Sequence, residues 1–203
     1  ANPNAPTGRA LPLADIEALL KGNPDSVVLV DEAYVDFGAH SAAELIGRYP
    51  NLVVVQTMSK SRALAGLRVG FALANENLIA ALDCVKNSFN SYPLDRLAQA
   101  GALGALEDPA YFRQITEQIK DTREEFAGRF REMGFEGCES CANFLFLTHR
   151  RVAAKDLLDG LRKRGILVRW WDKPRIRNYL RITVGAREEM EALAAALADL
   201  TAE

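Results

Sequence analysis

Lys60 stands among small and hydroxyl-bearing residues, directly after an apolar run of the chain. That run, Leu-Val-Val-Val-Gln at 52–56, is short and β-branched and follows the turn signal Tyr-Pro-Asn, so it predicts a buried strand. Lys60 would then lie just past the carboxyl end of the strand, where open α/β sheets keep their ligand crevice. A partly desolvated lysine in that place can act as an amine nucleophile toward a carbonyl group. For a lysine judged alone, a solvated loop position remains the alternative.

The neighbours of Lys60 have the chemistry that a phosphate group requires. Thr57 and Ser59 offer hydroxyl donors, and Arg68 offers a cationic fork. These three residues favour a ligand site over a solvated loop.

A second apolar run, 26–30, predicts another buried strand, which leads into Asp31 and then Tyr34. A carboxylate at the end of a strand can face a cationic ring nitrogen and keep that nitrogen protonated. A helix-capping aspartate and a packed tyrosine are the alternatives if either residue is taken alone.

Four segments of the chain, in order, resemble the fold-type I pyridoxal-phosphate aminotransferases. Ser-Lys followed by Ala-Gly-Leu-Arg-Val-Gly-Phe is similar to the segment around the cofactor lysine of that family, and the four segments are 2–8, 31–34, 59–71 and 179–185. Within the superfamily, the set of motifs is most similar to the histidinol-phosphate aminotransferases. The resemblance covers nearly the whole chain.

The resemblance implies an α/β fold built in two parts. Residues 1–107 would form the C-terminal part of a large, mainly parallel-sheet domain that binds the cofactor. Residues 108–203 would form a long linking helix and a small C-terminal α/β domain. The strand and helix alternation after Gly134 independently suggests a small α/β domain.

The resemblance also implies pyridoxal 5'-phosphate as the cofactor, with Lys60 as the catalytic residue that holds it. Asp31 would face the pyridine nitrogen, and Tyr34 would donate a hydrogen bond to the phenolic oxygen. In the family an asparagine usually stands immediately before Pro-Thr-Gly, and Ala5 occupies that position here, so Asn4 is the expected substitute. The full set of cofactor-binding residues is Asn4, Asp31, Tyr34, Thr57, Ser59, Lys60 and Arg68.

Two arginines of the C-terminal part lie in or at the end of predicted strands. Residues 180–184 alternate with a period of two, which sets Arg181 opposite the apolar face, and a strand predicted at 166–169 ends in Arg169. Guanidinium forks suit carboxylates and phosphates, whereas the other basic residues nearby indicate a solvated face or a nucleic-acid patch. By resemblance, Arg181 holds the substrate α-carboxylate, Arg169 holds a phosphate or the second carboxylate of glutamate, and Asn143 lies near the carboxylate.

These roles imply transfer of an amino group between L-glutamate and imidazole-acetol phosphate, in histidine biosynthesis, by a cytoplasmic homodimer. Threonine-phosphate decarboxylases and aromatic amino-acid aminotransferases resemble the same motifs and remain alternatives. A non-catalytic fragment is the rival of another class, because the family carries a cofactor-stacking aromatic and a glycine-rich phosphate turn before the first motif. We therefore expect this chain by itself to bind the cofactor weakly and to show negligible activity.

The composition narrows the remaining classes of protein. The chain has 203 residues, of which 49% are hydrophobic and 26% charged, and its net charge of -2 argues against a nucleic-acid binder. No apolar run reaches membrane-spanning length, and we expect no signal peptide. Three cysteines argue against a disulfide framework, and the pair Cys138 and Cys141 lacks the further ligands that a zinc site needs, so no metal is expected.

Apolar periods and capping residues predict the other elements of the chain. They are a helix at 12–20, a strand at 68–74, a helix after Asn75, a helix at 93–106, a long helix from Asp108-Pro109 to Gly134, a strand at 142–147, a helix at 153–164 and a last helix that buries Met190, Leu193, Leu197 and Leu200.

Overall fold

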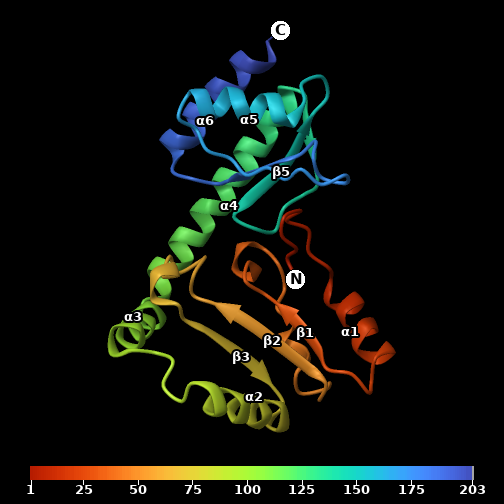
Figure 1. The fold of residues 1–203 in the computed structure, drawn as a ribbon, viewed down its shortest axis with the longest axis vertical. Helices are drawn as coiled ribbons and strands as arrows, with labels where there is room; N and C mark the ends of the chain where they lie inside the picture. Colours follow the sequence, from red (N-terminus) through yellow and green to blue (C-terminus); the bar gives the residue numbers. More distant parts are fainter. Residues whose placement is uncertain (203) are drawn as a thin grey trace. The chain divides into compact units, whose positions relative to one another are not determined.

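The computed structural model describes residues 1–202, which form two compact units (Figure 1). Unit 1 comprises Ala1–Pro3 and Ala10–Thr116. Unit 2 comprises Asn4–Arg9 and the chain from Glu117 onward.

Unit 1 contains a three-stranded sheet in the order β1–β2–β3. β1 (Val28–Asp31) runs parallel to β2 (Leu52–Thr57), and β2 pairs antiparallel with β3 (Gly70–Ala74). The described sheet is therefore mixed, with one parallel and one antiparallel pair. Because β1 and β2 are parallel, their carboxyl ends lie at the same edge of the sheet.

The main core of unit 1 lies between this sheet and α1 (Leu13–Gly22). Val30 of β1 pairs directly with Val54 of β2, so both side chains face the same side. They pack with Ile16 and Leu20, which are four residues apart and lie on one face of the helix. Three short 3-10 helices complete this part of the unit: η1 (Val35–Phe37), η2 (Ala42–Leu45) and η3 (Ala65–Leu67).

Two further helices of unit 1 are α2 (Glu76–Phe89) and α3 (Arg96–Glu107). The predicted cap is confirmed, because the Asn75 side chain accepts a hydrogen bond from the backbone nitrogen of Asn77 at 3.0 Å. The apolar face of α2 is largely exposed: Val85 is 68% and Phe89 93% accessible. Leu78 is only partly buried, so most of the apolar face that the period predicted stays exposed among the described residues.

The long helix α4 (Pro109–Glu132) begins in unit 1 and continues into unit 2. Its predicted start is confirmed, since the Asp108 carboxylate accepts a hydrogen bond from the backbone nitrogen of Tyr111 at 2.9 Å. Gly134 follows its end with a φ of +92°, a conformation that favours glycine. Phe126 and Phe130, from the predicted apolar stripe, are fully buried.

Unit 2 contains a second sheet, which is antiparallel throughout. Its strands are β4 (Phe135–Gly137), β5 (Phe144–His149) and β6 (Leu180–Thr183), in that order. Its helices α5 (Ala154–Lys163) and α6 (Arg187–Thr201) lie next to each other (Figure 1). The predicted period of β6 is confirmed, because Leu180 and Ile182 are each 1% exposed and face the helices.

Two predicted strands need correction. The segment 166–169 is not a strand, and only Arg169 bridges to Arg181. The backbone nitrogen of Ile166 instead bonds to the Leu161 carbonyl, which ties the start of the segment to the end of α5. The strand predicted at 68–74 begins only at Gly70, because Arg68 adopts a left-handed conformation with a φ of +57°.

Within residues 1–202, no helix combines the length and the apolar character needed to cross a membrane.

Candidate active site

Lys60 lies in the turn that follows β2, and two of the predicted phosphate ligands are close to it in the chain: Thr57 ends β2, and Ser59 is in the turn. The hydroxyl of Thr57 donates to Ser59 Oγ at 2.9 Å, and it accepts a hydrogen bond from the backbone nitrogen of Ser59 at 3.1 Å. Lys60 Nζ lies 5.6 Å from the centroid of the Tyr34 ring. The structure therefore brings Tyr34, Thr57, Ser59 and Lys60 to one edge of the sheet.

The expectation that Lys60 is partly desolvated is wrong for this structure, in which the side chain is exposed. The physical reason is its place in a turn beyond the strand, where its own neighbours are small. The amine thus remains accessible to a ligand.

Arg68 lies just before β3, at the end of the β2–β3 pair where the Lys60 turn begins. The backbone nitrogen of Met58 bonds to the Val69 carbonyl at 3.1 Å, so the residue before Val69 lies beside the Lys60 turn. Arg68 NH1 donates to the Ala65 carbonyl at 2.8 Å, and the side chain is exposed.

The turn at Lys60 is anchored on both sides by residues that the motifs did not reveal. Ser61 Oγ donates to Asp36 Oδ2 at 2.5 Å, although the two residues are 25 positions apart. Arg62 NH1 donates to the Ala105 carbonyl at 2.5 Å, and its guanidinium lies 3.9 Å from the centroid of the Phe112 ring. The backbone around the lysine is therefore fixed by η1 and by the end of α3.

Asp31 ends β1 at the same sheet edge, and its side chain is exposed. Its carboxylate accepts one hydrogen bond, from the backbone nitrogen of Ala33 at 3.0 Å. Its carbonyl accepts another from the backbone nitrogen of Asn2 at 2.8 Å. The buried Asn2 side chain accepts a hydrogen bond from the Leu11 backbone nitrogen at 2.7 Å, so it holds the two parts of this segment together.

Asn4 belongs to unit 2, in a turn closed by a hydrogen bond from the Gly8 nitrogen to the Asn4 carbonyl at 2.7 Å. The Asn4 side-chain oxygen accepts from Thr7 Oγ1 at 2.8 Å. The Gly8 carbonyl accepts from the Cys141 nitrogen at 2.8 Å, and a Cβ at Gly8 would stand 2.3 Å from Ser140 Oγ. Glycine is therefore required at position 8, because any Cβ there would clash with Ser140 and because a φ of +77° favours glycine.

Arg169 and Arg181 face each other in unit 2 across a hydrogen-bonded backbone pair. The Arg169 nitrogen bonds to the Arg181 carbonyl at 3.0 Å, and the Arg181 nitrogen to the Arg169 carbonyl at 2.8 Å. Residues paired in this way project to the same side of a ladder. The structure thus brings the two predicted substrate arginines together.

Arg181 has an unusual feature for a structural arginine. Its Nε is buried, and no acceptor among residues 1–202 bonds to it. Its guanidinium lies 5.0 Å from the centroid of the Phe144 ring, and a buried donor without an acceptor is costly unless a ligand supplies one. Asn143, the residue before Phe144, accepts a hydrogen bond from the Val184 nitrogen at 2.9 Å through its carbonyl.

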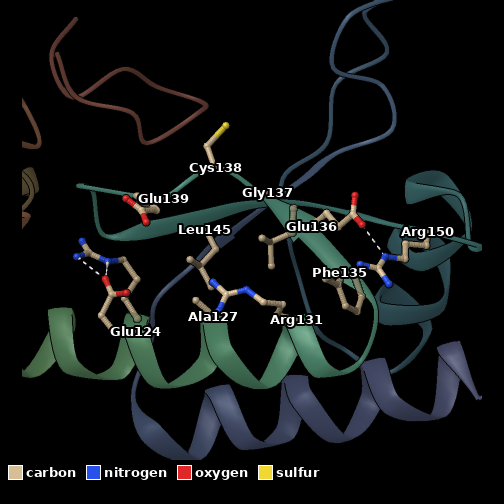
Figure 2. Close-up of a pocket in the computed structure, with 13 residues that line it drawn as sticks. Glu124, Ala127, Arg131, Phe135, Glu136, Gly137, Cys138, Glu139, Leu145 and Arg150 are labelled. Atoms are coloured by element: carbon tan, nitrogen blue, oxygen red, sulfur yellow. Dashed lines mark hydrogen bonds and ion pairs between the residues drawn. The ribbon is translucent and has the colours of Figure 1, made fainter.

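A cavity of about 230 Å³ lies between α4 and the hairpin of β4 and β5, and no predicted site residue lines it (Figure 2). Two of its arginines already have partners: Arg123 Nε bonds to Glu124 at 2.9 Å, and Arg150 Nε to Glu136 at 2.5 Å. Cys138 points away from the other lining side chains (Figure 2). The charges of this cavity largely neutralise one another, which does not suit a phosphorylated substrate.

The three cysteines, Cys84, Cys138 and Cys141, are free thiols. The part of the chain that the structure describes holds no group of three or more His, Cys, Asp or Glu side chains placed to bind a metal.

Comparison with known proteins identifies the family to which nearly the whole chain is similar. The model of the class I and II aminotransferases matches residues 1–197. The histidinol-phosphate aminotransferase of Marinomonas sp. (strain MWYL1) is 60% identical over 201 residues, which cover 98% of this chain and 57% of that protein. Histidinol-phosphate aminotransferase 1 of Pseudomonas aeruginosa is 56% identical over 196 residues, with 97% and 56% covered.

Solved structures show the same fold. The histidinol-phosphate aminotransferase from Sinorhizobium meliloti, in complex with pyridoxal-5'-phosphate, matches with a TM-score of 0.89 and 27% identity over 99% of this chain and 56% of its own. The L-threonine-O-3-phosphate decarboxylase from Porphyromonas gingivalis matches with a TM-score of 0.82 and 26% identity over 100% and 63%. The chain spans about half the length of the curated relatives it matches.

Proposed function

The chain belongs to the family of class I and II aminotransferases, and from that premise we propose that the protein transfers an amino group between L-glutamate and imidazole-acetol phosphate, with pyridoxal 5'-phosphate as cofactor. The observation that carries the proposal is the 60% identity, over nearly the whole chain, to a histidinol-phosphate aminotransferase. The solved decarboxylase is only 26% identical, so its chemistry is the weaker candidate.

The donor set at the end of β2 fits this cofactor. Lys60 forms no ion pair with a described residue, and its Nζ lies 5.6 Å from the centroid of the Tyr34 ring, so its amine is available to a carbonyl carbon. The hydroxyls of Thr57 and Ser59, with Arg68, would hold the phosphate. When bound, the cofactor supplies an electron sink for the carbanion that forms at the substrate Cα.

The side chains of unit 1 would act on protons in defined places. The Lys60 amine takes the proton from the substrate Cα, as a general base within reach of it. Asp31, an exposed carboxylate that accepts a hydrogen bond from the backbone nitrogen of Ala33, would face the ring nitrogen and keep that nitrogen protonated. Tyr34 donates its hydroxyl to the phenolic oxygen.

The side chains of unit 2 would recognise the acidic groups of the substrates. Arg181 supplies the donor fork for the α-carboxylate of glutamate, and its buried Nε gains the acceptor that it otherwise lacks. Arg169 supplies the second fork, for the other carboxylate or for the phosphate. Asn4 and Asn143 complete the proposed set.

We further propose a homodimer. The large apolar side chains exposed on α2 and α3, including Val85, Phe89 and Leu97, form the kind of surface that an obligate partner covers.

The test is a substrate comparison with added pyridoxal phosphate, in purified protein that spans the full length of the relatives, because the chain by itself is expected to show negligible activity. L-Glutamate with imidazole-acetol phosphate should give the keto acid of glutamate, at a kcat/KM well above that with phenylpyruvate as acceptor. L-Threonine O-phosphate should release no carbon dioxide. Preferential use of phenylpyruvate, or release of carbon dioxide, would assign the protein to one of the related activities instead.

A further inference from the structure

Trp171 lies against both substrate arginines of unit 2. The centroid of its ring system lies 5.3 Å from the guanidinium carbon of Arg169 and 5.5 Å from that of Arg181. Trp171 is two positions after Arg169. One aromatic ring system therefore contacts both cationic groups.

The two arginines need such a contact. Arg169 and Arg181 are directly opposite in a hydrogen-bonded backbone pair, and like charges in that position repel each other. Neither forms an ion pair with any residue in the described range 1–202. Without an anion present, electrostatic repulsion would drive the two side chains into separate and variable conformations.

The ring offsets this repulsion without neutralising the charges. A guanidinium group on an aromatic face is attracted by the negative face of the ring quadrupole. Phe144 contributes a second face for Arg181, with 5.0 Å between its ring centroid and the guanidinium carbon. The forks are thus ordered before a ligand arrives, which lowers the entropy lost on binding.

We propose that Trp171 is a positioning residue that aligns Arg169 and Arg181 for substrates with two acidic groups. This inference rests on the proposed function in one respect, that the arginines bind substrate anions. What it adds is that the ring system of Trp171 determines how strongly the site prefers dianionic to monoanionic ligands. Losing the ring should weaken a ligand that uses both forks more than one that uses a single fork.

The adjacent Trp170 provides a matched control. It packs against the hydrophobic core of unit 2, and its Nε1 donates to the Arg177 carbonyl at 2.6 Å. Its ring contacts Lys155, at 6.0 Å, and neither substrate arginine. A general effect of removing a tryptophan from this segment would therefore be seen in Trp170→Phe as well.

The experiment measures ligand binding and kinetics in the holoenzyme. Calorimetric titration with glutarate, which has two carboxylates but no amino group, is compared with titration with butyrate. Trp171→Leu should weaken glutarate binding roughly 3- to 30-fold and should raise the KM for glutamate similarly, with a smaller change in kcat and in butyrate binding. Trp171→Phe should restore most of the glutarate affinity, and Trp170→Phe should change none of these values.

The possible results separate the two proposals. If the protein does not transaminate but glutarate binding shows the expected losses, the proposed function fails and the role of Trp171 stands. If the protein transaminates and Trp171→Leu leaves glutarate binding and the KM within twofold of the wild type, Trp171 is not a positioning residue. Should Trp171→Leu not fold, the comparison of Trp171→Phe with Trp171→Met decides: equal affinities would overturn the proposal.

Discussion

Asp31 and Glu32 are adjacent carboxylates with opposite environments. Asp31 is exposed at the end of β1, whereas Glu32 is 1% exposed. The Glu32 carboxylate accepts three hydrogen bonds, from Ser41 Oγ at 2.6 Å, the Ala42 nitrogen at 2.6 Å and Gln56 Nε2 at 2.8 Å. The buried carboxylate thus fixes the backbone from which the exposed one projects.

Glu32→Gln should destabilise the protein by about 1 to 3 kcal/mol, because the amide would present donors where donors already point. The backbone nitrogen of Ala42 cannot rotate away, so at least one polar group would remain unsatisfied. Urea unfolding measures the loss. Glu44→Gln, a change at an exposed site of η2, is the control, and an equal midpoint for both variants would contradict this role.

Asp31→Asn should leave the cofactor bound and lower kcat roughly 10²- to 10³-fold, as expected for a group that stabilises charge in the transition state. An amide cannot keep the ring nitrogen protonated. Absorbance titration with pyridoxal phosphate and steady-state kinetics separate the two effects. Asp25→Asn, at an exposed turn before β1, should behave as wild type, and unchanged turnover in Asp31→Asn would remove Asp31 from the site.

Lys60→Arg should lower kcat by about 10² to 10⁴-fold, because a guanidinium group is neither a nucleophile nor a base at neutral pH. Added methylamine should restore part of the rate by replacing the missing amine. Borohydride reduction of the wild type, followed by peptide mapping, should place the cofactor on Lys60. Lys86, whose amine pairs with Asp83 at 2.6 Å, is the control lysine, and a label there would end the assignment.

Some of this architecture can be predicted from local patterns, and some cannot. The β-branched run at 52–56 and the alternation of Leu180 and Ile182 predict burial, because each pattern lies within a single strand. A period of two also predicts that Asp31 and Glu32 point in opposite directions. It does not say which one is buried, since that depends on Ser41 and Gln56, which lie elsewhere in the chain.

The contacts that position the site are those that join distant segments. The hydrogen bond of Ser61 to Asp36 depends on the packing of η1 beside the Lys60 turn, which no spacing within either segment encodes. The absence of the strand predicted at 166–169 has a similar cause: Ile166 and Val168 pack on the core of unit 2, but the segment forms no continuous ladder with β6. Local composition describes such a segment equally well as a strand or as a packed loop.

An ion pair between α4 and α6 leads to a prediction about pH. Arg129 donates to both carboxylate oxygens of Glu191, at 2.7 and 2.8 Å, and this hydrogen bonding holds the pKa of Glu191 below its usual value of 4.5. A lowered folded-state pKa contributes stability above the unfolded value and loses it as the pH falls through the folded one. The melting temperature of the wild type should therefore be higher than that of Glu191→Gln at neutral pH, and this difference should disappear well below pH 4.5.

Thermal melts of the two proteins at both pH values measure this gap. Glu139→Gln, at an exposed position of unit 2 without an ion pair among the described residues, is the control and should show no pH-dependent gap. A gap for Glu191→Gln that persists at low pH would mean that the substitution acts through packing.

Exchanging each substrate arginine for lysine should distinguish their roles. A lysine keeps the positive charge but loses the planar fork, so a bidentate contact becomes a single one, which weakens binding by about 10- to 100-fold. If Arg181 holds the α-carboxylate of glutamate, Arg181→Lys should raise the KM for glutamate far more than that for imidazole-acetol phosphate, which has no carboxylate. If Arg169 holds either the second carboxylate or the phosphate, Arg169→Lys should raise both KM values together.

Separate KM measurements for the two substrates test the roles of the two arginines, and Arg175→Lys, in the exposed loop between them, is the control. Equal effects of Arg169→Lys and Arg181→Lys on both substrates would contradict the division of roles.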